Sequence, residues 1–315
     1  MPVPAAVETS LYERLIPWLE RYGRTLVITV AFGWLLLFFL APFLIVLKIS
    51  FSEPLLAQPP YAPAFRWVEA MGATVLEIRL NVSNYLMLVE DSLYVRAFAN
   101  SLVIAAGSTA LTMAIGLPMA YAIARAPERW RPLLVVLVIL PFWTSFLIRV
   151  YAWIGILKPE GLLNALLLAI GVIDTPLAIL NTNVAVVIGI VYSYLPFMIL
   201  PIYASLDRLD VSLGEAAVDL GCRPGKVFWV ITVPLARPGI IAGCLLVFIP
   251  AVGEFVIPDL LGGSGTLMIG RTLWLEFFNN RDWPLASAVA IVLLVTLVLP
   301  IAWFQRSQGR AAGGA

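Results

Sequence analysis

Histidine is absent from this 315-residue chain, and charged side chains make up only 12% of it. The missing imidazoles remove the commonest general base and the commonest metal ligand, which disfavours a hydrolase or a metalloenzyme. Soluble domains carry far more charge, about one quarter of their residues. A water-soluble globule of this composition would aggregate, so the expected solvent of the chain is a lipid bilayer.

Cysteine is scarce as well, since the chain has only Cys222 and Cys244. The first falls in a loop and the second in an apolar run. We therefore expect no disulfide framework and treat both thiols as small packing groups.

Long apolar runs dominate instead: hydrophobic residues make up 61% of the chain. Crossing the hydrocarbon core takes roughly 20 residues. Six runs reach that length, and we predict an all-α integral membrane protein with six transmembrane helices at 26–47, 98–124, 132–157, 183–206, 238–258 and 283–304. The third run contains Arg149 and the fifth contains Glu254. A further run, 161–173, is too short to cross and is interpreted as an interfacial or re-entrant helix.

Basic residues predict the orientation of these spans. With the N-terminus in the cytoplasm, the inner segments hold 12 basic residues in 74 positions and the outer segments hold 7 in 99. The inner side is the richer one, so both termini are expected in the cytoplasm. The first run is longer than the core of a cleaved signal peptide and is expected to stay as an anchor. The predicted organisation is a cytoplasmic segment 1–25, a first span 26–47, an outer loop 48–97, a five-helix core 98–304 with a cytoplasmic loop 207–237, and a disordered tail 305–315.

The cytoplasmic loop 207–237 contains a short helix pattern. Ser212 and Glu215 have the spacing of a capping box, and Gly221 followed by Pro224 predicts the end of the helix. A second helix is expected from Pro224 toward Pro234. The first helix has a slim apolar face and an acidic face, formed respectively by Leu213, Ala216, Ala217 and Leu220, and by Glu215 and Asp219. Two roles fit these residues: the helices shield the ends of the bundle, or another surface docks closely against the alanines.

The stretch "EAAVDLG", followed after nine residues by "ITVP", resembles the EAA loop of membrane subunits of binding-protein-dependent ATP-driven (ABC) importers. It departs from that pattern at Val233, where leucine is usual. The resemblance implies the type I (MetI-like) permease fold and a coupling helix that docks into an ATPase subunit. The coupling residues it implies are Glu215, Ala216, Ala217, Asp219 and Gly221.

Three further blocks, 140–157, 247–263 and 277–290, resemble permeases of the spermidine and putrescine group. This resemblance implies a multi-pass protein of the bacterial inner membrane that pairs with a second permease, two ATP-binding subunits and an extracytoplasmic polyamine-binding protein. It implies neither enzymatic activity nor a bound cofactor in this chain, with ATP and Mg on the partner ATPase and no nucleic acid partner. Putrescine is the expected substrate; spermidine, another small ion, and a secondary transporter remain as alternatives.

The chain itself lacks a phosphate-binding loop. The stretch "GCRPGK" at 221–226 is one residue short of the required spacing, and Val227 stands where the magnesium ligand should be.

A path for a diammonium ion needs carboxylates and aromatic faces. Glu254 is the only acid within the predicted spans, and Asp259 follows at the same outer end. Trp143, Tyr151 and Trp153 are expected to supply aromatic walls, although Tyr151 and Trp153 also suit the interfacial aromatic belt.

Arg149 offers Glu254 another role. The two residues lie at similar depth when counted from the cytoplasmic starts of their spans. A buried ion pair between them would neutralise the acid and leave little attraction for a diamine. Both readings of Glu254, as a substrate ligand and as a partner of Arg149, remain open at this point.

Overall fold

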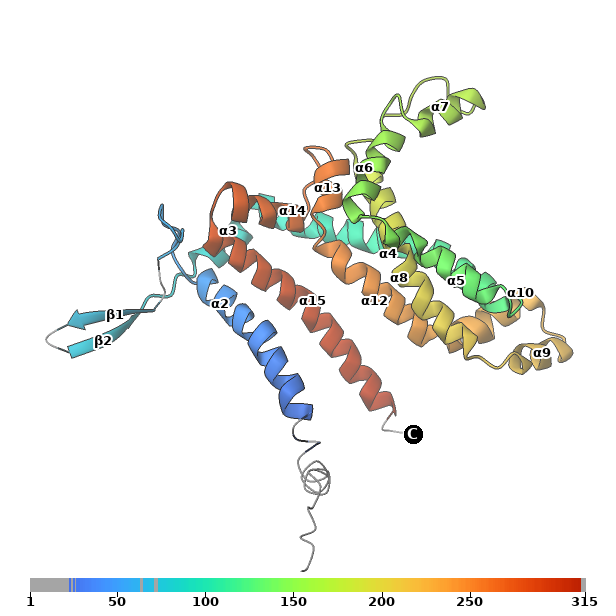
Figure 1. Ribbon diagram of the computed structural model, residues 1–315, viewed down its shortest axis with the longest axis horizontal. Coiled ribbons are helices and arrows are strands. Elements are labelled where there is room, and N and C mark those ends of the chain that lie inside the picture. The colour runs from blue at the N-terminus through green and yellow to red at the C-terminus, as the bar shows by residue number, and fades with distance from the viewer. Residues whose placement is uncertain (1–22, 24, 26, 63–64, 71–72, 313–315) are drawn as a thin grey trace, which may run out of the picture. The chain divides into compact units, whose positions relative to one another are not determined.

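The computed structural model describes residues 23, 25, 27–62, 65–70 and 73–312. The chain divides into two compact units, one made of residues 1–84 with 283–291 and the other of 85–282 with 292–315. Figure 1 labels the elements of both units, which are described separately below.

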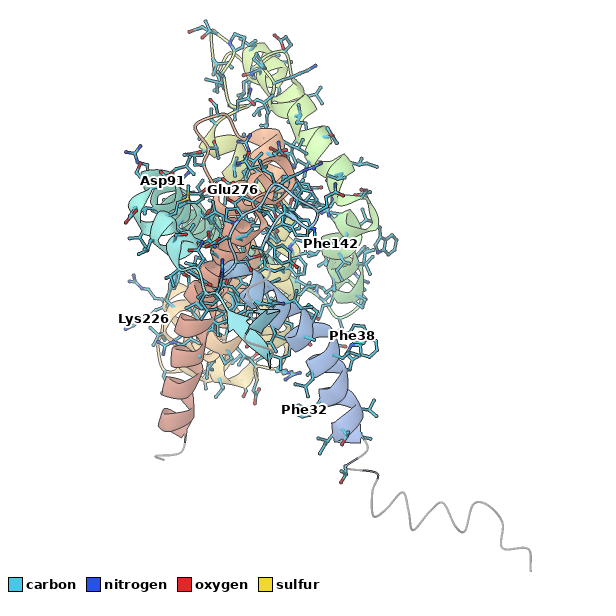
Figure 2. The ribbon with its side chains drawn as sticks, turned by 90° about the vertical axis from the view of Figure 1, so that its left-hand side faces the viewer. Phe32, Phe38, Asp91, Phe142, Lys226 and Glu276 are labelled. Carbon is cyan, nitrogen blue, oxygen red and sulfur yellow. The ribbon has the colours of Figure 1, made fainter. Side chains whose placement is uncertain are left out.

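The first unit contains one long apolar helix, Val27–Ser50, that includes the π-helical turn η1 (Leu36–Leu40) and α2 (Ala41–Ser50). No part of its apolar stretch is buried within the chain. Phe32 and Phe38 project from this helix into its surroundings (Figure 2) and are 62% and 57% exposed. Such a surface suits contact with lipid and agrees with the expected first span.

A β-hairpin follows in the expected outer loop. Strands β1 (Phe65–Ala70) and β2 (Ala73–Ile78) pair antiparallel, with Phe65 opposite Ile78. Asn84, in α3 (Ser83–Glu90), donates hydrogen bonds of 2.9 Å to the carbonyl oxygens of Ser50 and Ser52, so it ties the end of the loop to the end of α2. The predicted all-α class is confirmed for the described residues, with this two-stranded sheet as an addition in the expected outer loop.

The core of the second unit consists of α4 (Ser92–Arg125), α8 (Asn183–Asp207) and α12 (Arg237–Val252), which pack against one another. Small residues allow this close approach. A Cβ atom on Gly116 would lie 2.9 Å from Met198 Cγ, and one on Gly243 would lie 2.9 Å from Met198 Sδ. Gly116, Ala120 and Ala124 follow one another at four-residue spacing and are all buried, so they mark an intramolecular packing face of the kind that helices in lipid use.

The third predicted span, 132–157, is broken. It forms α5 (Arg131–Ile139), the 3₁₀ turn η2 (Leu140–Trp143) and α6 (Phe146–Leu157), with Thr144 in an extended conformation between the last two. Pro141 lies inside the turn and has no N–H for a helical hydrogen bond. The short run that follows forms α7 (Leu162–Ala169).

The fifth predicted span, 238–258, is also interrupted. Before it, a helix runs over Pro224–Leu235 and bends by 69° into α12. This helix consists of α10 (Pro224–Val227), the π turn η3 (Phe228–Thr232) and α11 (Val233–Leu235). The chain leaves the helix at Gly253 and resumes as α13 (Val256–Leu261).

The remaining elements are α9 (Ser212–Asp219), α14 (Ile269–Trp274), η4 (Leu275–Asn279) and α15 (Trp283–Ala312). The disordered tail expected from residue 305 is instead helical to Ala312. Among the described residues, four helices are long and apolar enough to cross a membrane, and the bent pair makes a fifth. A count of six spans is therefore not confirmed.

Candidate functional site

Helix α9 is held at both ends by local hydrogen bonds. Asp210 Oδ1 accepts from the N–H of Ser212 at 3.0 Å, and this bond, with one from the Ser212 hydroxyl, lowers the pKa of the Asp210 carboxyl. The predicted capping box is wrong, because the N-cap is Val211 and makes no side-chain hydrogen bond. The side chain of Asp210, two residues before Ser212, accepts a backbone hydrogen bond at the start of the helix instead.

The predicted end of α9 is confirmed at Gly221. This glycine adopts φ +87°, the left-handed region that glycine enters without steric cost. Its N–H donates to Val218 O at 2.8 Å, and the N–H of Cys222 donates to Ala217 O at 3.0 Å. Together these bonds form a Schellman motif that turns the chain sharply into α10.

The apolar face of α9 is exposed. Leu213 is 49% exposed and Leu220 is 89% exposed, and α9 contains no buried residue. An 89% exposed leucine at a helix end contributes almost nothing to the fold of this chain. The reading in which the helix merely shields the bundle predicts the opposite, namely that these leucines pack inward.

The acidic face of α9 borders an open groove beside the chain's own helices, and Glu215 and Asp219 are themselves exposed. Glu215 and Asp219 line a cavity of about 320 Å³ whose opposite walls come from the last turn of α4 and from α10 and η3. The Arg125 guanidinium lies 5.6 Å from the ring centroid of Tyr121. None of these three charged groups forms an ion pair with any described residue. The two faces of α9 therefore have different surroundings.

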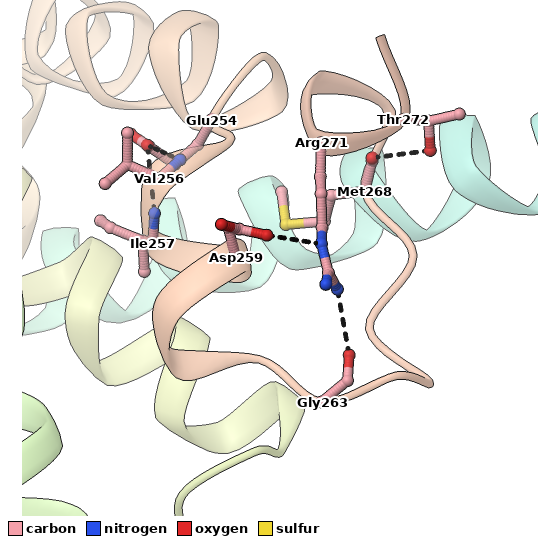
Figure 3. A network of polar contacts seen from close by, with 8 residues as sticks. All are labelled: Glu254, Val256, Ile257, Asp259, Gly263, Met268, Arg271 and Thr272. Carbon is pink, nitrogen blue, oxygen red and sulfur yellow. Dashed lines mark hydrogen bonds and ion pairs between the residues drawn. The ribbon is translucent and has the colours of Figure 1, made fainter. Parts of the chain in front are cut away.

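Glu254 lies in the break between α12 and α13 and is 7% exposed. One carboxylate oxygen accepts from the Tyr194 hydroxyl, and the other accepts from the N–H groups of Val256 at 3.1 Å and Ile257 at 3.4 Å. Figure 3 shows the two backbone bonds. The carboxylate thus satisfies free N–H groups at the start of α13, a role that the sequence reading missed.

The pairing of Arg149 with Glu254, one of the two roles left open for this acid, is not formed in this structure. The Arg149 guanidinium lies 5.1 Å from the ring centroid of Phe142 and 5.7 Å from that of Phe146. Its Nε atom is buried without a hydrogen-bond partner among the described residues. The physical reason is that Glu254 already has three donors, while the rings hold the guanidinium by cation-π attraction.

An aromatic series connects the surroundings of these two charged groups. Phe142, beneath Arg149, contacts Phe197 with centroids 5.1 Å apart, and Phe197 lies 6.1 Å from Tyr194, the donor to Glu254. The breaks of the third and fifth predicted spans therefore meet on the same stretch of α8. Discontinuous helices meeting inside a bundle are a common setting for substrate sites in transporters.

The other residues predicted for the substrate path have partners other than Glu254. Asp259 is neutralised by Arg271, whose Nε lies 3.1 Å from Asp259 Oδ1 and whose Nη1 donates to Gly263 O at 3.2 Å (Figure 3). Trp153 packs edge-on against Tyr192 at 5.3 Å.

Trp143 and Tyr151 are 76% and 57% exposed. Within the part of the chain that the structure describes, neither of these two side chains makes a ring contact. The structure brings Glu254 together with Tyr194, whose ring lies beside that of Phe197, and not with Trp143 or Tyr151. The spacing of Tyr194 and Phe197 around Pro196 is the signal that could have identified them.

Comparison with known proteins places this arrangement in a family. Residues 112–311 match the profile of the binding-protein-dependent transport system inner membrane component. The chain belongs to that family. Its members are transport components, so the chain is a permease subunit and not an enzyme.

Curated relatives resemble the chain over nearly its whole length. It is 40% identical over 285 residues to the spermidine/putrescine transport system permease protein PotB of Haemophilus influenzae, covering 90% of this chain and 94% of the relative. It is 40% identical over 283 residues to the protein of the same name from Escherichia coli, covering 90% and 96%. The resemblance to the spermidine and putrescine group stated above is confirmed.

Solved structures share the fold at low sequence identity. A bacterial ABC transporter involved in the import of the acidic polysaccharide alginate gives a TM-score of 0.68 at 17% identity, covering 95% of this chain and 99% of that one. The alginate transporter in complex with a pentasaccharide-bound periplasmic protein gives 0.66 at 16% identity, with 92% and 96% covered. The fold is therefore that of an ABC importer membrane component.

Proposed function

We propose that this permease forms half of the polyamine path of an ATP-driven importer of the bacterial inner membrane and is moved by an ATPase that docks on α9. The single observation that carries the coupling is the exposed apolar face of α9, with Leu220 89% exposed. Leaving such a face in water is unfavourable, so it suits a surface that a partner covers. The motif that resembles the EAA loop lies on this same helix.

The partners follow from the same proposal. A second permease completes the path, two ATP-binding subunits hold ATP and Mg, and an extracytoplasmic binding protein delivers the polyamine. The basic residues of the loops support an arrangement with both termini and α9 in the cytoplasm, where ATP is available. Glu215, Ala216, Ala217, Asp219 and Gly221 are the proposed coupling residues.

Glu254 is proposed as the carboxylate of the substrate path. It is the acid at the point where the two broken spans meet α8; the Tyr194 hydroxyl donates to it, and the Phe197 ring lies 6.1 Å from the ring of Tyr194. A diammonium ion that loses its hydration shell is stabilised by such an acid and such rings. The names of the relatives favour putrescine and spermidine, and we take putrescine as the first substrate to test.

Competitive uptake of labelled putrescine and spermidine, in cells that lack their own polyamine systems, tests this function. Cells that express the chain with its partner subunits are expected to accumulate putrescine, and Glu254→Gln is expected to lower uptake while leaving assembly intact. Glu128→Gln removes an exposed carboxylate outside the path and is the matched control. If Glu254→Gln takes up putrescine as well as the parent chain does, Glu254 is not part of the substrate path. If cells that express the parent complex take up neither polyamine, the substrate is not a polyamine.

A further inference from the structure

Arg149 is a cation inside a predicted span, and no acid of the described chain balances its charge. It makes no hydrogen bond or ion pair with any residue that the structure describes. Its Nε atom is enclosed without a partner, whereas the two terminal Nη groups are not enclosed, so the end of the guanidinium reaches the surface of the chain. The rings of Phe142 (labelled in Figure 2) and Phe146 attract the cation but do not neutralise it.

The guanidinium lies at the depth of the hydrocarbon core. It is 5.1 Å from the ring of Phe142, which is itself 5.1 Å from the ring of Phe197. Phe197 lies ten residues before Asp207, the last residue of α8, and is therefore about 15 Å from that end of the span. The hydrocarbon core is about 30 Å thick, so both Phe197 and Arg149 lie well inside it.

This position excludes the nearest sources of negative charge. Lipid phosphates lie at the surface of the bilayer, outside the hydrocarbon core. Glu254, the only acid in the predicted spans, is already bound by the Tyr194 hydroxyl and two backbone N–H groups. A diammonium substrate would be repelled by the guanidinium. Because a charge without a partner at this depth is costly, we expect the missing carboxylate to come from another chain.

The surface beside Arg149 is open and suits another helix. Helix α6 packs against α7, α8 and α13, and its remaining face is exposed: Ile148, Tyr151, Ala152 and Gly155. Ile148 is 66% exposed, and a Cβ atom on Gly155 would meet nothing within 4 Å. Small residues three positions apart, such as Ala152 and Gly155, let helices approach closely in lipid. An acid on the approaching helix would meet the guanidinium at the edge of this face.

We propose that this exposed face of α6 binds a membrane helix of the second permease, through an ion pair between Arg149 and an aspartate or glutamate of that helix. The carboxylate accepts two hydrogen bonds from the Nη groups, a geometry that arginine favours. A second copy of this chain does not fit, because the oxygens of its span acid, Glu254, are occupied. The pair therefore selects a non-identical permease. The inference rests on the proposed function, since it takes the second permease as the partner.

Co-purification measures this association. The tagged chain is expressed with its second permease and its ATPase, and the amount of second permease retained is followed over a dilution series in mild detergent. Arg149→Gln is expected to weaken the association by about 30-fold or more, as does loss of one partner from a buried, hydrogen-bonded charge pair. Arg129→Gln makes the same chemical change at an exposed arginine between α4 and α5, and this matched control is expected to retain the second permease.

A charge swap identifies the partner. Arg149→Glu is expected to lose the second permease, and replacing one of the few span acids of that permease with arginine is expected to restore the association at least 10-fold. Capture of the ATPase by Arg149→Gln shows that the variant is folded. If that capture is also lost, the swap decides, because recovery requires the two charges to meet.

Three results would overturn the inference. Unchanged association in Arg149→Gln removes the ion pair, and failure of every acid-to-arginine change to restore Arg149→Glu removes the carboxylate of the second permease. Association of two differently tagged copies of this chain, if lost in Arg149→Gln, assigns the face to a homodimer. Putrescine uptake is measured separately. A complex that assembles through Arg149 but takes up no polyamine would refute the proposed substrate and leave this inference intact.

Discussion

Truncation of Leu220 tests the docking face of α9 quantitatively. The residue is 89% exposed, so nearly its whole side chain is available to a partner and almost none of it supports the fold. Leu220→Ala removes three carbons, which at about 0.8 kcal/mol for each buried methylene weakens docking by about 2 kcal/mol. That free energy corresponds to an increase of about 30-fold in the Kd for the ATPase subunit.

Biolayer interferometry between the purified permease and its ATPase subunit measures this Kd. Leu177→Ala makes the same chemical change at a 42% exposed leucine of the loop before α8 and is expected to leave the Kd unchanged. Thermal unfolding of Leu220→Ala is expected to match that of the parent chain, because the side chain has few internal contacts. The reasoning is refuted if Leu220→Ala binds the ATPase subunit with an unchanged Kd, since the apolar face of α9 would then not be the docking surface.

Three substitutions and one control test the packing of the chain through the melting temperature in detergent. Gly270→Ala places a Cβ atom 2.3 Å from a backbone carbonyl and is expected to destabilise by about 1 to 3 kcal/mol, whereas Gly225→Ala, with no neighbour within 4 Å, is expected to be neutral. Tyr194→Phe removes the hydroxyl donor to Glu254 and is expected to cost about 1 to 2 kcal/mol; unchanged melting would show that the bond contributes nothing. Gly221→Ala forces a side chain into φ +87° and is expected to cost about 1 kcal/mol and to weaken ATPase binding, so normal binding would contradict the role of the turn.

The sequence predicted the elements that depend on composition and local spacing. Apolar runs located the helices around α4, α8 and α12, because a long uncharged run has no stable alternative in lipid. Gly221 located the end of α9, since a glycine after a short amphipathic run commonly adopts the left-handed conformation.

The breaks within the predicted spans escaped the sequence reading for a physical reason. A run that is apolar on every side has no periodicity. Proline does not locate the break either, because Pro141 lies at one whereas Pro118 and Pro196 lie inside unbroken helices. The paired strands 65–70 and 73–78 were detectable in principle, because the two runs together are rich in valine, isoleucine and aromatic residues.

The partners of the ionisable residues required the three-dimensional structure. Sequence depth suggested that Arg149 and Glu254 could pair, but depth along a helix does not give the direction of a side chain. Tyr194, which donates to Glu254, is 60 residues away in the chain. Arg271, which neutralises Asp259, follows it by 12 residues across a glycine-rich turn, a closure that spacing alone does not reveal.

The most direct measurement of the central claim is putrescine uptake into proteoliposomes that contain this chain, its second permease and its ATPase. The binding protein is supplied on the side of the membrane from which putrescine is taken up. The account predicts that accumulation requires ATP and stops when Leu220 is replaced by aspartate, although the complex of permeases still forms. Accumulation without ATP, or undiminished accumulation by Leu220→Asp, would contradict a permease that is driven through the apolar face of α9.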